Sequence, residues 1–163
     1  MILTLWRHGE AEPNHSDEQC ALGHLGQKYS RAMAESYEQW RLSADITPVA
    51  EVFFSPYRRT RETAELLADA LQSDRLEVLK KLAPGACHER FAEEQFETSQ
   101  HLIMVTHQPF ISRAISYWTD DTTLAPLAPG GYSALEVLSL QRGGASSLRH
   151  CPDPRAVTQE GFV

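Results

Sequence analysis

Three short motifs of the sequence contain histidine, arginine or both. Each motif follows a short apolar run. An arginine guanidinium binds phosphate or carboxylate through a planar fork of donors, and a neutral imidazole is a nucleophile. These residue types therefore indicate chemistry on an anion such as a phosphoryl group. The motifs, in chain order, are Arg7-His8-Gly9-Glu10, Ser55-Pro56-Tyr57-Arg58-Arg59 and Thr106-His107-Gln108-Pro109.

His8 is the candidate nucleophile of the first motif. An imidazole must be neutral to attack phosphorus, and the positive charge of neighbouring arginine disfavours its protonation. Gly9 is expected to let the backbone approach a ligand closely. Taken alone, an Arg-His-Gly triplet also fits an ordinary strand end whose charges lie in solvent.

Arg59 is the candidate anion ligand of the second motif. Arginines in the first turn of a helix oppose its dipole unless an anion or an acidic side chain compensates. A spacing of four residues pairs Arg58 with Glu62 and Arg61 with Glu65. Arg59 has no such partner in the helix, so it is the arginine that we expect to bind a ligand.

His107 is placed where a buried strand is predicted to pass into a helix. A histidine at such a position is often only packed or hydrogen-bonded. In the functional interpretation, its Nε2 donates a hydrogen bond to a phosphoryl oxygen, and the following helix N-terminus adds a favourable dipole.

The hydrophobic pattern predicts the elements that position these motifs. Apolar runs predict strands, and apolar residues at steps of three and four predict helices. The expected strands cover residues 2–6, 52–54, 76–79, 102–106 and, as a closing antiparallel edge strand, 134–140. The expected helices cover 22–40, 55–71 and 111–118, and the second of these is expected to begin with Ser55 as its cap and Pro56 in its first turn. Residues 86–100 are helix-permissive. The tail from residue 152 is expected to be extended or frayed.

This alternation predicts an α/β three-layer sandwich, with a mostly parallel sheet between helices on both faces. In such sheets, ligands bind beyond the carboxyl ends of the strands. The three motifs follow three different strands, so we expect their histidines and arginines to meet at one edge of the sheet.

Composition limits the classes of protein that the chain can belong to. Its 163 residues fit one domain spanning 1–163, with 42% hydrophobic and 23% charged residues. No apolar run approaches the 18 residues of a membrane span, and the apolar start is too short for a signal peptide. A net charge of -7 argues against a nucleic-acid partner. The scattered cysteines, Cys20, Cys87 and Cys151, predict neither a disulfide framework nor a thiolate metal site, which favours the cytoplasm.

Together the motifs resemble those of the histidine phosphatase superfamily, whose fold is phosphoglycerate-mutase-like. The resemblance runs from residue 2 to about residue 140 in the family's order. The short chain and the Gly130-Gly131-Tyr132 sequence are similar to the compact SixA-type phosphohistidine phosphatases. The resemblance implies that His8 is the phosphorylated nucleophile and that Arg7, Arg59 and His107 complete the phosphate-binding pocket.

The sequence departs from the larger members of the family in its general acid. Those members carry a glutamate on an inserted segment before the second histidine, and the corresponding stretch here is short. Glu89 and Glu10 are the candidates, although Glu89 also fits a solvated helix face. No metal site is expected, because no H-x-x-x-H pair is present and arginine next to the motif histidines repels cations.

We therefore expect a metal-independent hydrolase without a cofactor that dephosphorylates phosphohistidine on a partner protein through a phosphohistidine intermediate. The first alternative is a broad-specificity or small-molecule phosphomonoesterase of the same superfamily. The second is a non-catalytic phosphate-binding module, which the presence of a nucleophile disfavours. A nucleic-acid or membrane partner is not expected, and no oligomeric state is predicted.

Overall fold

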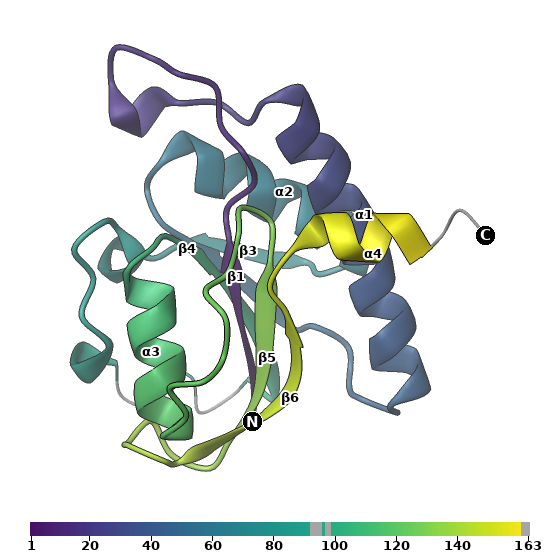
Figure 1. Ribbon diagram of the computed structural model, residues 1–163, viewed down its shortest axis with the longest axis vertical. Helices are drawn as coiled ribbons and strands as arrows, with labels where there is room; N and C mark the ends of the chain where they lie inside the picture. Colours follow the sequence, from purple (N-terminus) through teal and green to yellow (C-terminus); the bar gives the residue numbers. More distant parts are fainter. Residues whose placement is uncertain (92–95, 97–98, 161–163) are drawn as a thin grey trace.

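The computed structural model describes residues 1–91, 96 and 99–160 of the chain, and within them a twisted sheet carries helices on both faces (Figure 1). The strands are β1 (Ile2–Arg7), β2 (Glu51–Phe54), β3 (Arg75–Val78), β4 (His101–Thr106), β5 (Tyr132–Val137) and β6 (Ala145–Cys151). The helices are α1 (His24–Ser43), α2 (Arg58–Leu71), α3 (Phe110–Thr119) and α4 (Pro154–Glu160), with 3-10 turns η1 (Asp17–Gln19), η2 (Lys80–Leu82) and η3 (His88–Arg90).

The sheet has the order β3-β2-β4-β1-β5-β6. β1 to β4 run parallel to one another, whereas β5 is antiparallel to β1 and β6 is antiparallel to β5. The predicted α/β architecture with a mostly parallel sheet is thus confirmed. The prediction that residues 134–140 form an edge strand is wrong, because β6 pairs with the outer side of β5.

The sheet separates two hydrophobic cores, since successive side chains of a strand point to opposite faces. On one face, Leu5 and Met104 pack with Trp118 of α3. On the other face, Ile103 packs against α1 and α2, in a cluster that includes Tyr37. Burial on both faces explains why β1 and β4 are almost continuously apolar.

Most predicted elements are found within a few residues of their expected positions. The helical pattern of residues 22–40 corresponds to α1, although Leu25 is 47% exposed and does not belong to the core. The strand predicted at 76–79 is β3, an exposed edge strand. For the helix-permissive stretch 86–100, the structure gives one 3-10 turn, η3, and residues 92–95 and 97–98 lie outside the described residues.

Two predictions about element ends are wrong. α2 begins at Arg58 and not at Ser55, because the Ser55 side chain is directed into the hydrogen-bond network of the site described below. The tail is neither extended nor frayed as far as residue 160: it follows directly on β6 and forms α4, which lies beside α1 (Figure 1). Val157 packs against the same core as α1, which gives the tail an apolar anchor.

β2, β4 and β1 are direct neighbours in the sheet and all run in the same direction. Their carboxyl ends therefore lie side by side, and the segments that follow them are the three motifs. This neighbourhood of strands is the structural basis of the site.

Candidate active site

His8 follows directly on β1, and its two ring nitrogens have different environments. Nδ1 lies 2.8 Å from the carbonyl oxygen of Gly9, which can only accept a hydrogen bond. A neutral ring therefore carries its proton on Nδ1 and has its lone pair on Nε2. Nε2 lies 3.3 Å from the Nε–H of Arg59, which donates to it. The unprotonated nitrogen thus faces the cluster that His8 forms with Arg7, Arg59 and His107.

Burial lowers the pKa of His8 to about 4, and the positive charges of Arg59 and Arg7 act in the same direction, while the bond to Gly9 opposes them. His8 is therefore neutral at neutral pH. This is the protonation state that nucleophilic attack requires.

Arg59 lies in the first turn of α2 with its side chain only 10% exposed. Its Nη1 donates to the backbone oxygen of Asp17 at 2.7 Å and to Oδ1 of the same residue at 3.0 Å. Its Nη2 donates to Oδ2 of Asp17 at 3.3 Å and lies 3.5 Å from Nδ1 of His107. The sequence interpretation left Arg59 without an acidic partner; the structure supplies one from η1, 42 residues earlier in the chain.

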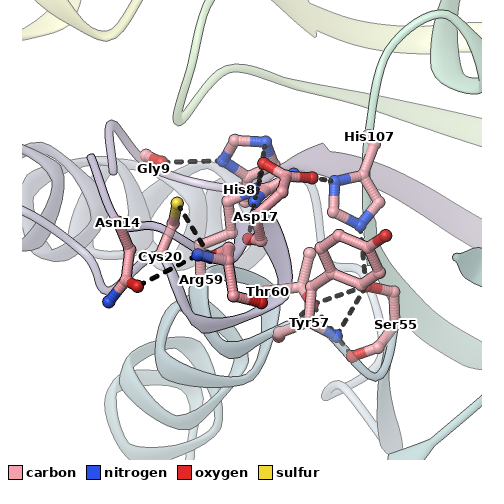
Figure 2. Close-up of polar contacts among 11 residues, drawn as sticks. His8, Gly9, Asn14, Asp17, Cys20, Ser55, Tyr57, Arg59, Thr60 and His107 are labelled. Carbon is pink, nitrogen blue, oxygen red and sulfur yellow. Dashed lines mark hydrogen bonds and ion pairs between the residues drawn. The ribbon is translucent and has the colours of Figure 1, made fainter. Parts of the chain in front are cut away.

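His107 is buried at the end of β4, and its Nε2 lies 2.7 Å from the hydroxyl oxygen of Ser55. The prediction that Nε2 faces the phosphoryl group is therefore corrected: Nε2 is occupied by Ser55, and Nδ1 faces Arg59. Burial lowers the pKa of His107 to about 3, with smaller contributions from the neighbouring charges of His8 and Arg59. Figure 2 shows His8, Arg59 and His107 directed toward one another; the two imidazole centroids are 5.1 Å apart.

Arg7, the last residue of β1, is held by a hydrogen bond from Nη1 to the carbonyl oxygen of Leu127 at 2.8 Å. Its buried Nε has no partner among the residues that the structure describes. Its charge acts on both His8 and His107, so it lies in the same electrostatic environment. The structure thus brings together all four residues that the sequence predicted for the pocket.

Gly9 has a different role from the one expected. A Cβ atom at this position would lie 2.9 Å from both Gly26 O and Ser30 Oγ of α1, so the absence of a side chain allows close packing on that helix. The Gly9 N–H donates to Thr63 Oγ1 of α2 at 3.1 Å. These contacts fix the backbone next to His8, whereas close approach to a ligand is not what requires glycine here.

The other two arginines of α2 point away from the cluster, as the helical register predicted. Arg58 pairs with Glu62 at 2.7 Å, and Arg61 lies 3.8 Å from Glu65. Both arginine side chains are about half exposed, at 43% and 54%. Only Arg59 of the three contributes to the cluster.

The two glutamates named as candidate acids lie elsewhere. Glu10 and Glu89 are both exposed, and no hydrogen bond or ion pair joins either to the cluster within the described part of the chain. The acidic group that does reach the cluster is Asp17, whose pKa is lowered by its hydrogen bonds to Arg59. Among residues 1–91, 96 and 99–160, no three His, Cys, Asp or Glu side chains are grouped as metal ligands.

Asp17 and Ser55 are the residues of the site that sequence reasoning missed. Asp17 belongs to a loop without periodicity, and its pairing with Arg59 depends on how that loop returns over α2. Ser55 was taken as a helix cap because it precedes proline. Its hydroxyl instead lies 2.7 Å from both His107 Nε2 and Thr60 Oγ1. The contact with His107 depends on the pairing of β2 with β4, which joins segments 52 residues apart.

Comparison with known proteins gives one family and one fold. The family model described as histidine phosphatase superfamily (branch 1) matches residues 3–97. No curated protein gives a significant match. None of the helices in the described residues is both long and apolar enough to span a membrane.

Solved structures show the same fold at low sequence identity. The protein histidine phosphatase SixA, in complex with tungstate, is 20% identical, with a TM-score of 0.80 over 96% of this chain and 99% of its own. A protein assigned as phosphohistidine phosphatase SixA from Agrobacterium tumefaciens is 16% identical, with a TM-score of 0.74 over 91% and 95%. A mycobacterial glucosyl-3-phosphoglycerate phosphatase complexed with VO3 is 13% identical, with a TM-score of 0.68 over 93% and 99%.

Proposed function

The chain belongs to the histidine phosphatase superfamily, and on that premise we propose that it is a phosphohistidine phosphatase acting on a phosphorylated partner protein. The observation that carries the proposal is the geometry at His8: its Nε2 is unprotonated and faces Arg59 and His107. We propose one catalytic domain of residues 1–163 that works in the cytoplasm.

In the first step, His8 is the nucleophile. The lone pair of Nε2 forms a bond to phosphorus while the bond from phosphorus to the leaving group breaks in line with it. The proton on Nδ1 stays in place, held by the carbonyl of Gly9. The product is an enzyme phosphorylated at Nε2 of His8, with a positively charged ring.

Arg7, Arg59 and His107 are the proposed ligands of the three non-bridging oxygens. The transition state of phosphoryl transfer spreads negative charge over these oxygens, and donors fixed in advance stabilise it without reorganisation. The two arginines are held in position by Leu127 O and by α2. For His107 to donate from Nδ1, its Nε2 must accept a hydrogen bond that the Ser55 hydroxyl donates, which the 2.7 Å contact allows.

In the second step, water cleaves the intermediate. The water oxygen bonds to phosphorus, the P–N bond breaks, and its electron pair returns to Nε2 of His8. Phosphate leaves with one of the protons of water, and the other is released to solvent. No step is assigned to a metal ion or cofactor.

The substrate assignment to phosphohistidine is supported by the leaving group that the site can expel. An alkoxide leaving group needs a general acid, which contributes about 10²–10⁴-fold when it is present. The carboxylate that reaches the cluster, Asp17, has a lowered pKa and is therefore ionised and unable to act as an acid at neutral pH. An imidazole needs no such acid, because it leaves as a neutral ring. The likeness of the fold to the protein histidine phosphatase SixA is consistent with this choice.

The experiment that tests the proposal is a comparison of kcat/KM on three substrates under one set of conditions: a histidine-phosphorylated protein, phosphoserine and a sugar phosphate. Phosphohistidine is expected to be the most efficiently used. His8→Ala is the control, expected to lower kcat by roughly 10³-fold or more while the fold is retained. A variant with a tenth of the wild-type kcat would contradict the covalent mechanism.

A small-molecule phosphomonoesterase is the second candidate. The observation in its favour is the similarity of fold to the glucosyl-3-phosphoglycerate phosphatase, whose name indicates a sugar phosphate ester as substrate. Higher kcat/KM on the sugar phosphate than on phosphohistidine would replace the first proposal with this one. Absence of turnover on every substrate, with phosphate still bound, would support a non-catalytic binding module.

A further inference from the structure

The carboxylate of Asp17 stands at the mouth of the cluster. Asp17 is the first residue of η1, in the loop that connects β1 to α1. Its side chain is 70% exposed, whereas the side chain of Arg59 that it contacts is 10% exposed. Arg59 therefore lies in the wall of the site, and Asp17 lies on its exposed side. Figure 2 shows Asp17 close to both Arg59 and His8.

The hydrogen bonds of this carboxylate use the same donors that a phosphoryl group needs. Oδ1 and Oδ2 of Asp17 contact Nη1 and Nη2 of Arg59 at 3.0 and 3.3 Å. A phosphoryl group has more charge and more oxygens than a carboxylate, so it competes well for the guanidinium. The exposed side chain of Asp17 has room to move outward, and its backbone oxygen, 2.7 Å from Nη1, can stay bound.

The leaving group of a protein substrate is expected on the exposed side of the site, where the side chain of Asp17 also lies. In-line attack requires the leaving group to lie beyond phosphorus as seen from His8 Nε2, whose neighbour in the site is Arg59. That side must be the open one, because the leaving group belongs to a large partner. A negatively charged carboxylate at this place repels a departing alkoxide and attracts a ring that carries a positive charge.

We propose that Asp17 is a specificity-determining residue that selects, as the substrate, a phosphohistidine whose ring carries a proton on the nitrogen that is not bonded to phosphorus. This inference rests on the function proposed above and adds a residue to it. The carboxylate accepts a hydrogen bond from the ring N–H of the substrate that is not bonded to phosphorus.

The step balances without transfer of a proton. The Nε2 lone pair of His8 forms the new N–P bond, and the electron pair of the broken P–N bond stays on the ring nitrogen of the substrate. The substrate histidine leaves as a neutral imidazole that keeps its proton on the other nitrogen, next to Asp17. The positive charge passes to the ring of His8, where the carbonyl of Gly9 receives the Nδ1–H.

The test uses Asp17→Asn, which removes the charge and nearly keeps the shape. Its matched control is Glu18→Gln, which removes the same charge from the neighbouring exposed residue of η1. Both variants and the wild type are assayed on a histidine-phosphorylated protein and on p-nitrophenyl phosphate. Dissociation constants for tungstate are measured as well.

For Asp17→Asn we expect kcat/KM on the phosphohistidine protein to fall at least tenfold relative to kcat/KM on p-nitrophenyl phosphate. Tungstate is expected to bind at least twofold more tightly, because a competitor for Arg59 is weakened. Glu18→Gln should leave the ratio of the two substrates within a factor of two. In the profile of kcat against pH with phosphohistidine, the loss of activity at high pH should begin at least half a unit lower for Asp17→Asn, because the carboxylate no longer stabilises the protonated ring.

Two results would overturn the inference. An equal loss on both substrates would show that Asp17 only positions Arg59, and unchanged kcat/KM on both substrates would show that it has no part in the reaction. Either result leaves the proposed function intact if the wild type uses phosphohistidine. A wild type that does not use phosphohistidine rejects the proposed function itself, and the role of Asp17 with it.

Discussion

At the scale of single residues, the state of His8 depends on where β1 ends. The ring is carried into a partly buried position between two arginines, and the backbone turn at Gly9 supplies the acceptor for Nδ1–H. Burial and the neighbouring charges keep the ring neutral, and the turn selects which nitrogen is free. The tautomer and the protonation state of His8 therefore follow from a few residues of the chain, and both suit the nucleophile that we propose.

The first prediction concerns the pH dependence of His8. Its pKa in the folded protein is about 4, below the value of about 6.5 for an unfolded chain. Between these values the unfolded chain binds more protons than the folded one, so acidification from about pH 6.5 to about pH 4 lowers the free energy of unfolding. A single histidine contributes a slope of at most about 1.4 kcal/mol per pH unit.

His8→Asn removes this group, so its unfolding free energy should depend less steeply on pH in that window than that of the wild type. Urea denaturation at several pH values measures the difference. Titration of the His8 ring by NMR provides an independent readout. A midpoint near 6.5 for His8 would contradict the expected burial of the neutral ring.

The second prediction separates the arginines of α2. Arg59→Ala removes the donors that we propose for the phosphoryl oxygens and should lower kcat by about 10²–10³-fold on p-nitrophenyl phosphate. Arg61→Ala is the matched control, because it removes the same type of side chain two positions later in α2. The Arg61 side chain is 54% exposed, and it lies 3.8 Å from Glu65 and away from the cluster. Its kcat should stay within a factor of two. Comparable losses in both variants would mean that the register of α2 is wrong.

The residues proposed for the pocket could be named from the sequence because each motif carries its own chemical signal. Arg59 was distinguished from Arg58 and Arg61 by helical spacing, and in the structure it alone of the three contacts His8, while the other two pair with glutamates of α2. Asp17 could not be predicted in this way. Its contact with Arg59 joins a loop to a helix 42 residues apart, and neither spacing nor composition records such a contact.

At the scale of elements, the site depends on the register between β1, β2 and β4 and on how α2 is attached to β1. The hydrophobic pattern predicted these strands, because buried parallel strands are apolar on both faces. It did not predict β6 or α4. β6 is mostly polar and half-exposed, and it is ordered by pairing with β5, so its own sequence carries little signal.

The third prediction tests the attachment of α2 to β1. Thr63→Val keeps the shape of the side chain but leaves the buried Gly9 N–H, now 3.1 Å from Thr63 Oγ1, without a partner. An unsatisfied buried donor costs about 1–3 kcal/mol of stability. Activity should fall as well, because Gly9 is next to His8.

Thr119→Val is the matched control for this variant. Thr119 Oγ1, like Thr63 Oγ1, donates to the carbonyl four residues earlier in its own helix, but the backbone N–H that donates to it belongs to Asp121 and not to the segment that follows β1. Unfolding free energies from urea denaturation and kcat on p-nitrophenyl phosphate compare the two. If Thr119→Val lowers both quantities as much as Thr63→Val does, the bond to Gly9 has no special part in the site.

At the scale of the whole molecule, the distribution of charge sets the kind of ligand that the site accepts. The chain as a whole has a net charge of -7, yet the cluster at the carboxyl edge of the sheet holds two arginines beside two neutral histidines. The local field therefore favours an anion, although the overall charge does not. The exposed Asp17 is the acidic group that reaches this cluster from the described chain.

The last prediction follows from this local field. A divalent cation placed among Arg7, Arg59 and the two histidines would be repelled by the guanidinium charges, and a tetrahedral oxyanion would be attracted by them. Dialysis against EDTA is therefore expected to leave kcat on p-nitrophenyl phosphate unchanged, whereas tungstate or vanadate should inhibit competitively. The inhibition should weaken at least tenfold in Arg59→Ala, because that variant loses donors to the oxyanion, and should persist in the control Arg61→Ala. Loss of activity on dialysis that a divalent metal ion restores would show that a cation takes part in the reaction, and the assignment of the phosphoryl oxygens to the arginines would then have to be abandoned.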